Sequence, residues 1–131
     1  MNQLNMKNDM KVIYNDIIPF GFANYINLFG VIFTKLPNLK LKKEVENHEM
    51  IHTYQMKYML YIFFYIWYGI EYVLKFIPAL FWNRGNFWPL QFAYRSISFE
   101  QEAFYNQNNL KYLETVKPYA WLKYIFSMYK N

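Results

Sequence analysis

The sequence predicts a mainly α-helical protein with a short β element, an α+β chain that forms a single domain over residues 1–131. Three stretches of sequence lead to this expectation. Residues 17–34 are rich in β-branched and aromatic side chains, residues 41–68 contain neither Pro nor Gly, and residues 90–113 are again compatible with a helix. A chain of 131 residues is long enough to bury one hydrophobic core.

The two short strands are expected within residues 17–34, where Pro19, Gly21 and Gly30 interrupt the apolar pattern. Residues 27–33 form the better strand of the two. Pro37 and Asn38 then indicate a loop before the long helical run begins.

The first long helix is expected over residues 41–68, and it becomes free of charge after residue 58. Glu71 and Lys75 follow at i, i+4 spacing, and Pro78 ends or kinks the helix. Residues 58–82 resemble a transmembrane span. A bend at Gly69 or Pro78 would instead give a helical hairpin that inserts into a membrane or packs on its surface.

The remaining elements are a turn at residues 83–86, a second helix over residues 90–113, and a short aromatic and basic segment after Pro118. That last segment is expected to cover the core or to rest on lipid. Residues 1–16 are polar and lack the apolar stretch of a signal peptide, which favours the cytoplasmic face of the cytoplasmic membrane.

Composition also favours a membrane over nucleic acid. The net charge of +5 comes mainly from lysine, whereas nucleic-acid recognition favours the arginine fork. Aromatic residues make up 24% of the chain, and Tyr and Trp collect at the boundary of a bilayer. The chain has no cysteine, so any metal must be held by His and carboxylate side chains.

Both histidines of the chain lie in one pentapeptide, HEMIH, which begins at His48 and ends at His52. On a helix of about 100° per residue, positions i and i+4 lie about 40° apart, so both imidazoles can reach one metal ion. Glu49 lies beside the open coordination position, where a carboxylate acts as a general base. This HExxH pattern predicts a catalytic zinc site. The alternative is that both histidines decorate an exposed helix face.

A hydrolytic zinc site usually has three protein ligands and one water. The downstream carboxylates are Glu100, Glu102 and Glu114. Glu100 is favoured, because it shares a helix face with the small Ala103, which lets the second helix approach the first. Glu102 points about 200° away from Glu100 and is the alternative ligand.

HEMIH followed downstream by a helical Glu100-x-x-Ala103 resembles the gluzincin metallopeptidases, in which a glutamate on a second helix completes the zinc site. The similarity is greatest to the membrane-bound branch, which comprises the CAAX prenyl proteases, the HtpX heat-shock peptidases and the peptidase domain of BlaR-type antibiotic sensors. The segment NLFGVIF also resembles the edge strand that precedes their zinc helix.

This resemblance implies a membrane-associated zinc metallopeptidase that cleaves a peptide or protein substrate. By position, His48, His52 and Glu100 would be the ligands and Glu49 the general base. The family motif ends in Asp where this chain has Phe104, so the hydrogen bond to a ligand histidine must come from elsewhere.

Three residues near the third ligand have the chemistry of an oxyanion donor, namely Tyr94, Arg95 and Tyr105. Gln55, three residues after His52, is a candidate for orienting a ligand or the Glu100 carboxylate, and the alternative is a plain polar helix residue. The alternative function is a non-catalytic subunit, in which the zinc or only the fold braces two helices inside a larger membrane assembly.

Overall fold

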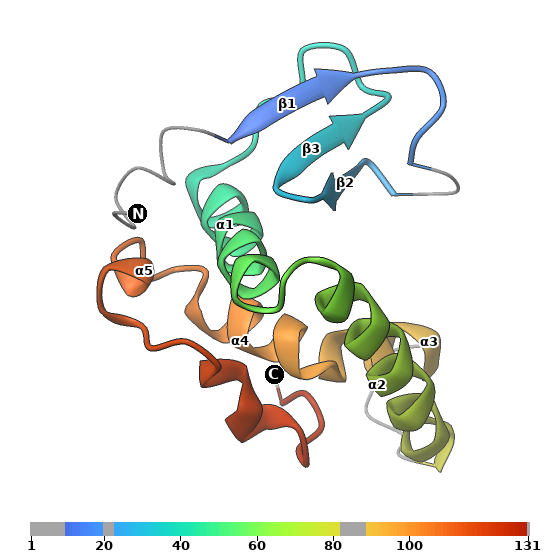
Figure 1. Cartoon of the computed structure of the whole chain (residues 1–131). Helices are drawn as coiled ribbons and strands as arrows, with labels where there is room; N and C mark the ends of the chain where they lie inside the picture. Colours follow the sequence, from blue (N-terminus) through green and yellow to red (C-terminus); the bar gives the residue numbers. More distant parts are fainter. Residues whose placement is uncertain (1–9, 20–22, 82–88, 131) are drawn as a thin grey trace.

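The computed structural model describes residues 10–19, 23–81 and 89–130. Within them the chain is mainly helical with one small sheet, which confirms the α+β expectation (Figure 1). The turn expected at residues 83–86 lies outside the described residues.

The sheet has three strands, β1 (Lys11–Tyr14), β2 (Tyr25–Leu28) and β3 (Val31–Thr34), in the order β1-β3-β2. β3 pairs with β1 in parallel and with β2 in antiparallel fashion. Two strands were expected in this region, but the continuous strand over residues 27–33 is wrong. The chain reverses at Phe29 and Gly30, both with positive φ, and β2 and β3 form a hairpin around them.

The hairpin turn is fixed against the helix α1 (Lys43–Tyr58) by Asn27 and Gly30. The Asn27 side chain donates to the Glu49 carbonyl at 3.0 Å and accepts from the Gly30 N–H at 3.0 Å. Gly30 has φ of 88°, and a Cβ placed there would lie 3.0 Å from Thr53 Cγ2. Glycine is therefore required both by the backbone conformation and by the close approach to α1.

Replacing Gly30 with Ala is expected to lower the free energy of unfolding by about 1–3 kcal/mol, because it adds both left-handed strain and a steric contact. Chemical denaturation measures this loss. The exposed Gly69 is the matched control, because a Cβ placed there would have no neighbouring atom within 4 Å. Its change to Ala, which favours a helix, should not destabilise the protein.

The helix α1 (Lys43–Tyr58) carries the HExxH segment and ends earlier than expected. Leu60 and Tyr61 both adopt positive φ, of 52° and 58°, and the chain then enters α2 (Ile62–Phe81). The single helix over residues 41–68 is therefore wrong, as is the bend at Gly69 or Pro78, since both residues lie inside α2. The break lets the chain turn into α2 directly beside the end of α1 (Figure 1).

The helix expected over residues 90–113 is also divided. It comprises α3 (Pro89–Ser96), α4 (Ser98–Asn106) and the short α5 (Tyr112–Thr115). A buried ion pair on α2 holds the break between α3 and α4. Glu71 accepts hydrogen bonds from the backbone N–H and the hydroxyl of Ser98, at 2.7 and 2.6 Å, and Lys75 donates to the Ser96 carbonyl. This pair starts α4 at Ser98 and so places Glu100 in its first turn.

The C-terminal segment covers the core, which was one of the two arrangements expected for the residues after Pro118. It contains the 3₁₀ helix η2 (Ala120–Tyr124), whose Trp121 is buried against Phe99. Lys75 also donates to the carbonyls of Tyr124 and Ser127, at 3.0 and 2.8 Å, which fastens the segment to α2.

Candidate metal centre

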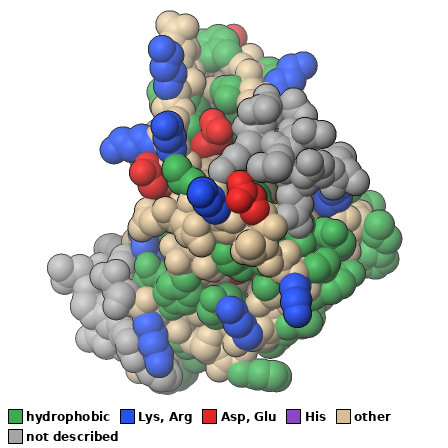
Figure 2. Space-filling model, turned by 90° about the vertical axis from the view of Figure 1, so that its left-hand side faces the viewer, with side chains coloured by type: hydrophobic (Ala, Val, Ile, Leu, Met, Phe, Trp, Pro, Cys, Tyr) green, Lys and Arg blue, Asp and Glu red, His purple; other side chains and the backbone are tan. Residues whose placement is uncertain are grey.

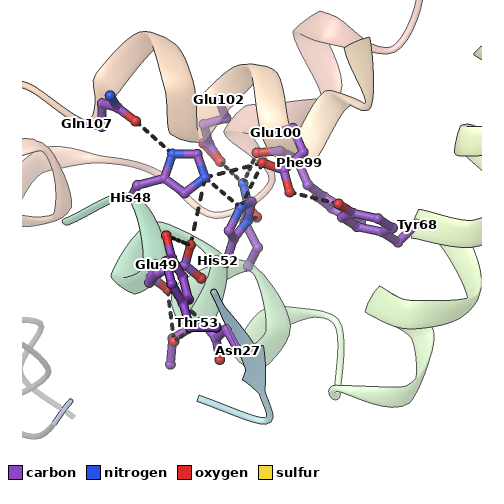
Figure 3. Close-up of polar contacts among 12 residues, drawn as sticks. Asn27, His48, Glu49, His52, Thr53, Tyr68, Phe99, Glu100, Glu102 and Gln107 are labelled. Atoms are coloured by element: carbon purple, nitrogen blue, oxygen red, sulfur yellow. Dashed lines mark hydrogen bonds and ion pairs between the residues drawn. The ribbon is translucent and has the colours of Figure 1, made fainter. Parts of the chain in front are cut away.

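Three side chains from α1 and α4 converge on one point, as Figure 3 shows. His48 Nε2 lies 3.2 Å from Glu100 Oε1, and His52 Nε2 lies 3.1 Å from the same oxygen. The two Nε2 atoms are 3.1 Å apart. All three residues are buried, so the alternative that the histidines decorate an exposed helix face is wrong.

A glutamine amide fixes the orientation of each histidine ring. Gln55 Nε2 donates to the Phe99 carbonyl and to Glu102, so its Oε1 accepts from His52 Nδ1 at 2.8 Å. Gln107 Oε1 accepts from His48 Nδ1 at 2.8 Å. With each Nδ1 donating to a glutamine amide oxygen, both rings turn Nε2 toward Glu100. Gln55 therefore orients a histidine, as expected.

Gln107 makes the contact that the sequence pattern left open at Phe104. The Phe104 ring packs edge-on against the His48 ring, with centroids 4.5 Å apart. Gln107 follows Glu100 by seven residues and returns to the same face of the chain about two turns later. Asn47 holds it there, since its side chain donates to the carbonyls of Asn106, Gln107 and Asn109 at 3.3, 2.9 and 3.0 Å.

This donor set fits a divalent metal. Two imidazole nitrogens and one carboxylate oxygen lie 3.1–3.2 Å apart and point to a common centre. Three potential acceptors at that distance are stabilised by a proton or a metal cation between them. In a tetrahedral zinc site with bonds of about 2.0–2.1 Å, neighbouring ligand atoms are separated by about 3.3 Å. His48, His52 and Glu100 thus have the chemistry and nearly the spacing of three zinc ligands.

The close approach of these side chains shifts the pKa values of His52 and Glu100. Burial alone lowers the pKa of His52, but the Glu100 carboxylate and its hydrogen bond raise that pKa to about 9. Burial alone raises the pKa of Glu100, whereas the two imidazoles lower it below the usual range of a carboxyl. A proton on His52 therefore balances the charge of the Glu100 carboxylate.

Zinc affinity is expected to rise with pH because zinc competes with that proton. The pKa of His52 is raised from 6.5 to about 9, so the stabilisation from its protonated form is complete below pH 6.5 and is lost as the pH rises through 9. Zinc needs the neutral ring. We expect affinity to increase by about tenfold per pH unit between pH 7 and 9 and then to level off. Titration against a chelator, corrected for its own protonation, measures this, and an affinity independent of pH would contradict it.

A cavity of about 390 Å³ lies beside His52 and Glu100. It is lined from β2, α1, α2, α3 and α4 by Tyr25, Ile26, Asn27, Glu49, His52, Met56, Phe64, Tyr65, Tyr68, Tyr94 and Glu100. Its volume falls within the range of small-molecule sites, and its lining is largely aromatic with a few convergent polar groups. One or two side chains of a peptide would fill it.

Glu49 faces this cavity from α1, next to the ligands. Its Oε2 lies 4.0 Å from His48 Nε2, and the Tyr25 hydroxyl donates to it at 3.4 Å. Asn27 and Thr53 both donate to its backbone carbonyl, at 3.0 Å each, from the side away from the metal ligands (Figure 3). The Glu49 carboxylate is thus held near His48 but outside the cluster that His48, His52 and Glu100 form.

Two tyrosines present protonated hydroxyls at the cavity. Tyr68 donates to Glu100 Oε2 at 2.8 Å, which leaves Oε1 for the histidines. Burial and the nearby Glu100 charge raise the pKa of Tyr68 and of Tyr94 well above the usual value. Both therefore remain hydrogen-bond donors at physiological pH.

Of the three expected oxyanion donors, the structure places Tyr94 on the cavity and the other two elsewhere. The Arg95 guanidinium lies over the rings of Phe104 and Tyr129, 4.9 and 5.6 Å from their centroids. Tyr105 stacks on Tyr129 and accepts a hydrogen bond from the Lys130 N–H at 2.7 Å. The physical reason is helical rotation, since Arg95 lies about 100° from Tyr94, and Tyr105 about 140° from Glu100.

Glu102, the alternative ligand, points away from the histidines. It accepts from Gln55 Nε2 at 2.9 Å and from the Tyr112 hydroxyl at 3.0 Å. Its position two residues after Glu100 turns it to the other side of α4. The structure therefore brings Glu100, and not Glu102, to the imidazole pair.

The sequence interpretation missed Tyr25, Tyr68, Asn27 and Gln107. Tyr25 and Tyr68 carried no signal among fourteen tyrosines. Asn27 lies in a strand whose pairing was not foreseen. Gln107 had one usable signal, its seven-residue spacing from Glu100, which keeps two residues on one helix face.

Searches of protein-family models, of curated proteins and of solved structures found no match to this chain. The assignment of functional residues therefore depends on the geometry of the site alone.

Proposed function

We propose that this protein is a metal-dependent hydrolase of the gluzincin type that cleaves peptide bonds and uses zinc. The observation that carries the proposal is the meeting of His48, His52 and Glu100 within 3.2 Å, with Glu49 beside them. Two imidazoles and one carboxylate are a usual ligand set of a hydrolytic zinc site, and a second carboxylate beside them is the usual general base.

When bound, zinc supplies a Lewis acid that polarises the substrate carbonyl and lowers the pKa of a bound water toward neutrality. His48, His52 and Glu100 would hold the ion, and the two glutamine amides would keep both imidazoles in the tautomer that binds it.

Glu49 accepts the proton of the water that attacks the scissile carbonyl and then donates it to the leaving amine. Tyr25, which donates to Glu49 at 3.4 Å, orients this carboxylate. The Tyr94 hydroxyl, on the wall of the cavity, donates to the oxyanion that forms on the former carbonyl oxygen.

The experiment that tests this proposal is cleavage of a defined mixture of unrelated peptides by the purified protein. Mass spectrometry identifies the products. We expect cleavage that 1,10-phenanthroline abolishes and that added zinc restores. Cleavage that persists in the chelator would indicate a contaminant or a different mechanism.

The second candidate function is a zinc-braced, non-catalytic subunit of a larger membrane assembly. It is favoured by the burial of all three ligands and by their origin on two separate helices, α1 and α4, which a metal would fasten together. In that case zinc raises the melting temperature, and no peptide is cleaved at any zinc concentration.

A further inference from the structure

The outward face of α2 is entirely apolar. All ten exposed positions of this 20-residue helix carry hydrocarbon or glycine, namely Ile62, Phe63, Ile66, Gly69, Ile70, Val73, Leu74, Ile77, Leu80 and Phe81. At about 100° per residue, the nine large ones fall within an arc of about 120°. Phe81 is 85% exposed, and the other eight are 46–63% exposed.

The charged residues of α2 face the opposite way. Glu71 and Lys75 are buried, 3.0 Å apart, and each is also hydrogen-bonded to the protein. A helix on the surface of a water-soluble protein has the reverse pattern, with its apolar stripe inward and its charges outward. Charges that face inward and are fully paired are typical of helices in contact with hydrocarbon.

We propose that the exposed face of α2 is a lipid-docking surface, and that α2 lies in the plane of the membrane surface with this face among the acyl chains. Lipid is the occupant that fits, because the arc carries no hydrogen-bonding side chain over its whole length. An interface with another protein has a polar rim and about one hydrogen bond per 100–200 Å². The net charge of +5 suits an anionic lipid surface.

Length and composition would also let α2 cross a bilayer, and it is the one such helix among the described residues. Its surroundings favour the in-plane orientation. The C-terminal segment packs along α2, through Trp121 on Trp67 and through Lys75 on the Ser127 carbonyl. That segment exposes Lys123 and Lys130, which a spanning helix would carry into hydrocarbon.

The face shown in Figure 2 differs in character from the outward face of α2. On the face shown in Figure 2, Lys and Arg side chains and Asp and Glu side chains are interspersed with apolar ones. Such a mixture of charged and apolar side chains is typical of a surface that is in contact with water. The contrast assigns lipid contact to the α2 side.

Flotation with vesicles of phosphatidylcholine and phosphatidylglycerol at a ratio of about 3:1 tests the surface. The wild-type chain should float with the vesicles. The double variant Ile70→Glu/Ile77→Glu, which places two carboxylates near the centre of the arc, should bind at least about tenfold less. Val12→Glu/Ile17→Glu is the matched control at two other exposed apolar positions and should bind like the wild type. Both variants should melt like the wild type, because all four positions are exposed.

Orientation is tested with single-cysteine variants, which the cysteine-free chain permits. Phe63→Cys, Ile70→Cys and Ile77→Cys, each carrying an environment-sensitive fluorophore, are quenched by lipids labelled at known depths. An in-plane helix gives one shallow depth at all three positions. A depth that is greatest at residue 70 would show a spanning helix and overturn the proposal.

A wild-type chain that stays out of the vesicles would also overturn it. So would a wild-type dimer that the Ile70→Glu/Ile77→Glu variant converts to a monomer without any lipid binding, since the occupant would then be a second copy. None of these positions lies in the metal centre, so flotation is measured equally well without zinc, and its outcome is independent of hydrolysis.

Discussion

The Glu100→Gln variant is expected to lose zinc affinity by more than a hundredfold. The amide keeps the size of the side chain but removes the anionic ligand that lies 3.1–3.2 Å from both imidazoles. Loss of a residue that hydrogen-bonds to a metal ligand typically lowers metal affinity by about 10–100-fold, and loss of a ligand itself lowers it further. Metal content after dialysis and a competitive zinc titration measure the effect.

Glu102→Gln is the matched control, because it makes the same chemical change two residues away on the same buried helix. Its partners are Gln55 and Tyr112 and not the metal-binding atoms, so zinc affinity should fall by no more than about tenfold. Retention of zinc by Glu100→Gln, together with its loss from Glu102→Gln, would reverse the ligand assignment.

The Glu49→Gln variant is expected to keep its zinc and to lose peptide cleavage by about three orders of magnitude in kcat/KM. Glutamine cannot accept the proton of the attacking water, and general base catalysis contributes about 10²–10⁴-fold. The backbone of residue 49 stays anchored by Asn27 and Thr53, so the site should keep its shape.

Glu44→Gln, at an exposed position in the first turn of the same helix, is the control and should retain both zinc and turnover. Cleavage by Glu49→Gln at the wild-type rate would remove Glu49 from the mechanism. If neither the wild type nor Glu49→Gln cleaves any peptide while both bind zinc, the zinc-braced subunit becomes the better account.

The parts of the site that the sequence predicted are those that depend on helical spacing alone. His48 and His52 lie on one face of α1 because the i, i+4 relation holds in any helix. Gln55 lies one turn further along the same helix and contacts His52, as expected. Glu100 was identified by a local argument too, since it shares a face with the small Ala103, which is fully buried.

The sequence did not predict where the helices break. Residues 59–61 contain no Pro or Gly, and the left-handed conformations of Leu60 and Tyr61 are tolerated because Tyr61 packs into the core beside α1. Pro78 and Gly69, which carry the local signals for a bend, remain inside α2. Tertiary packing thus overrides local preference at both places.

The Glu71 and Lys75 pair is a second feature whose role the sequence did not predict. In the sequence, the pair only interrupts an apolar run. In the structure it turns inward, caps α4 at Ser98 and thereby sets the position of Glu100. Only contacts between segments distant in sequence reveal this role, and the same holds for β1, which pairs in parallel with β3 from 20 residues away.

A crystal structure of the zinc-loaded protein, with anomalous diffraction recorded at the zinc edge, tests directly whether His48, His52 and Glu100 bind one zinc ion. One peak is expected within about 2.0–2.2 Å of His48 Nε2, His52 Nε2 and a Glu100 carboxylate oxygen, with Glu49 beside it but not bound. A zinc ion bound elsewhere, or no anomalous peak between α1 and α4, would contradict the assignment of this site.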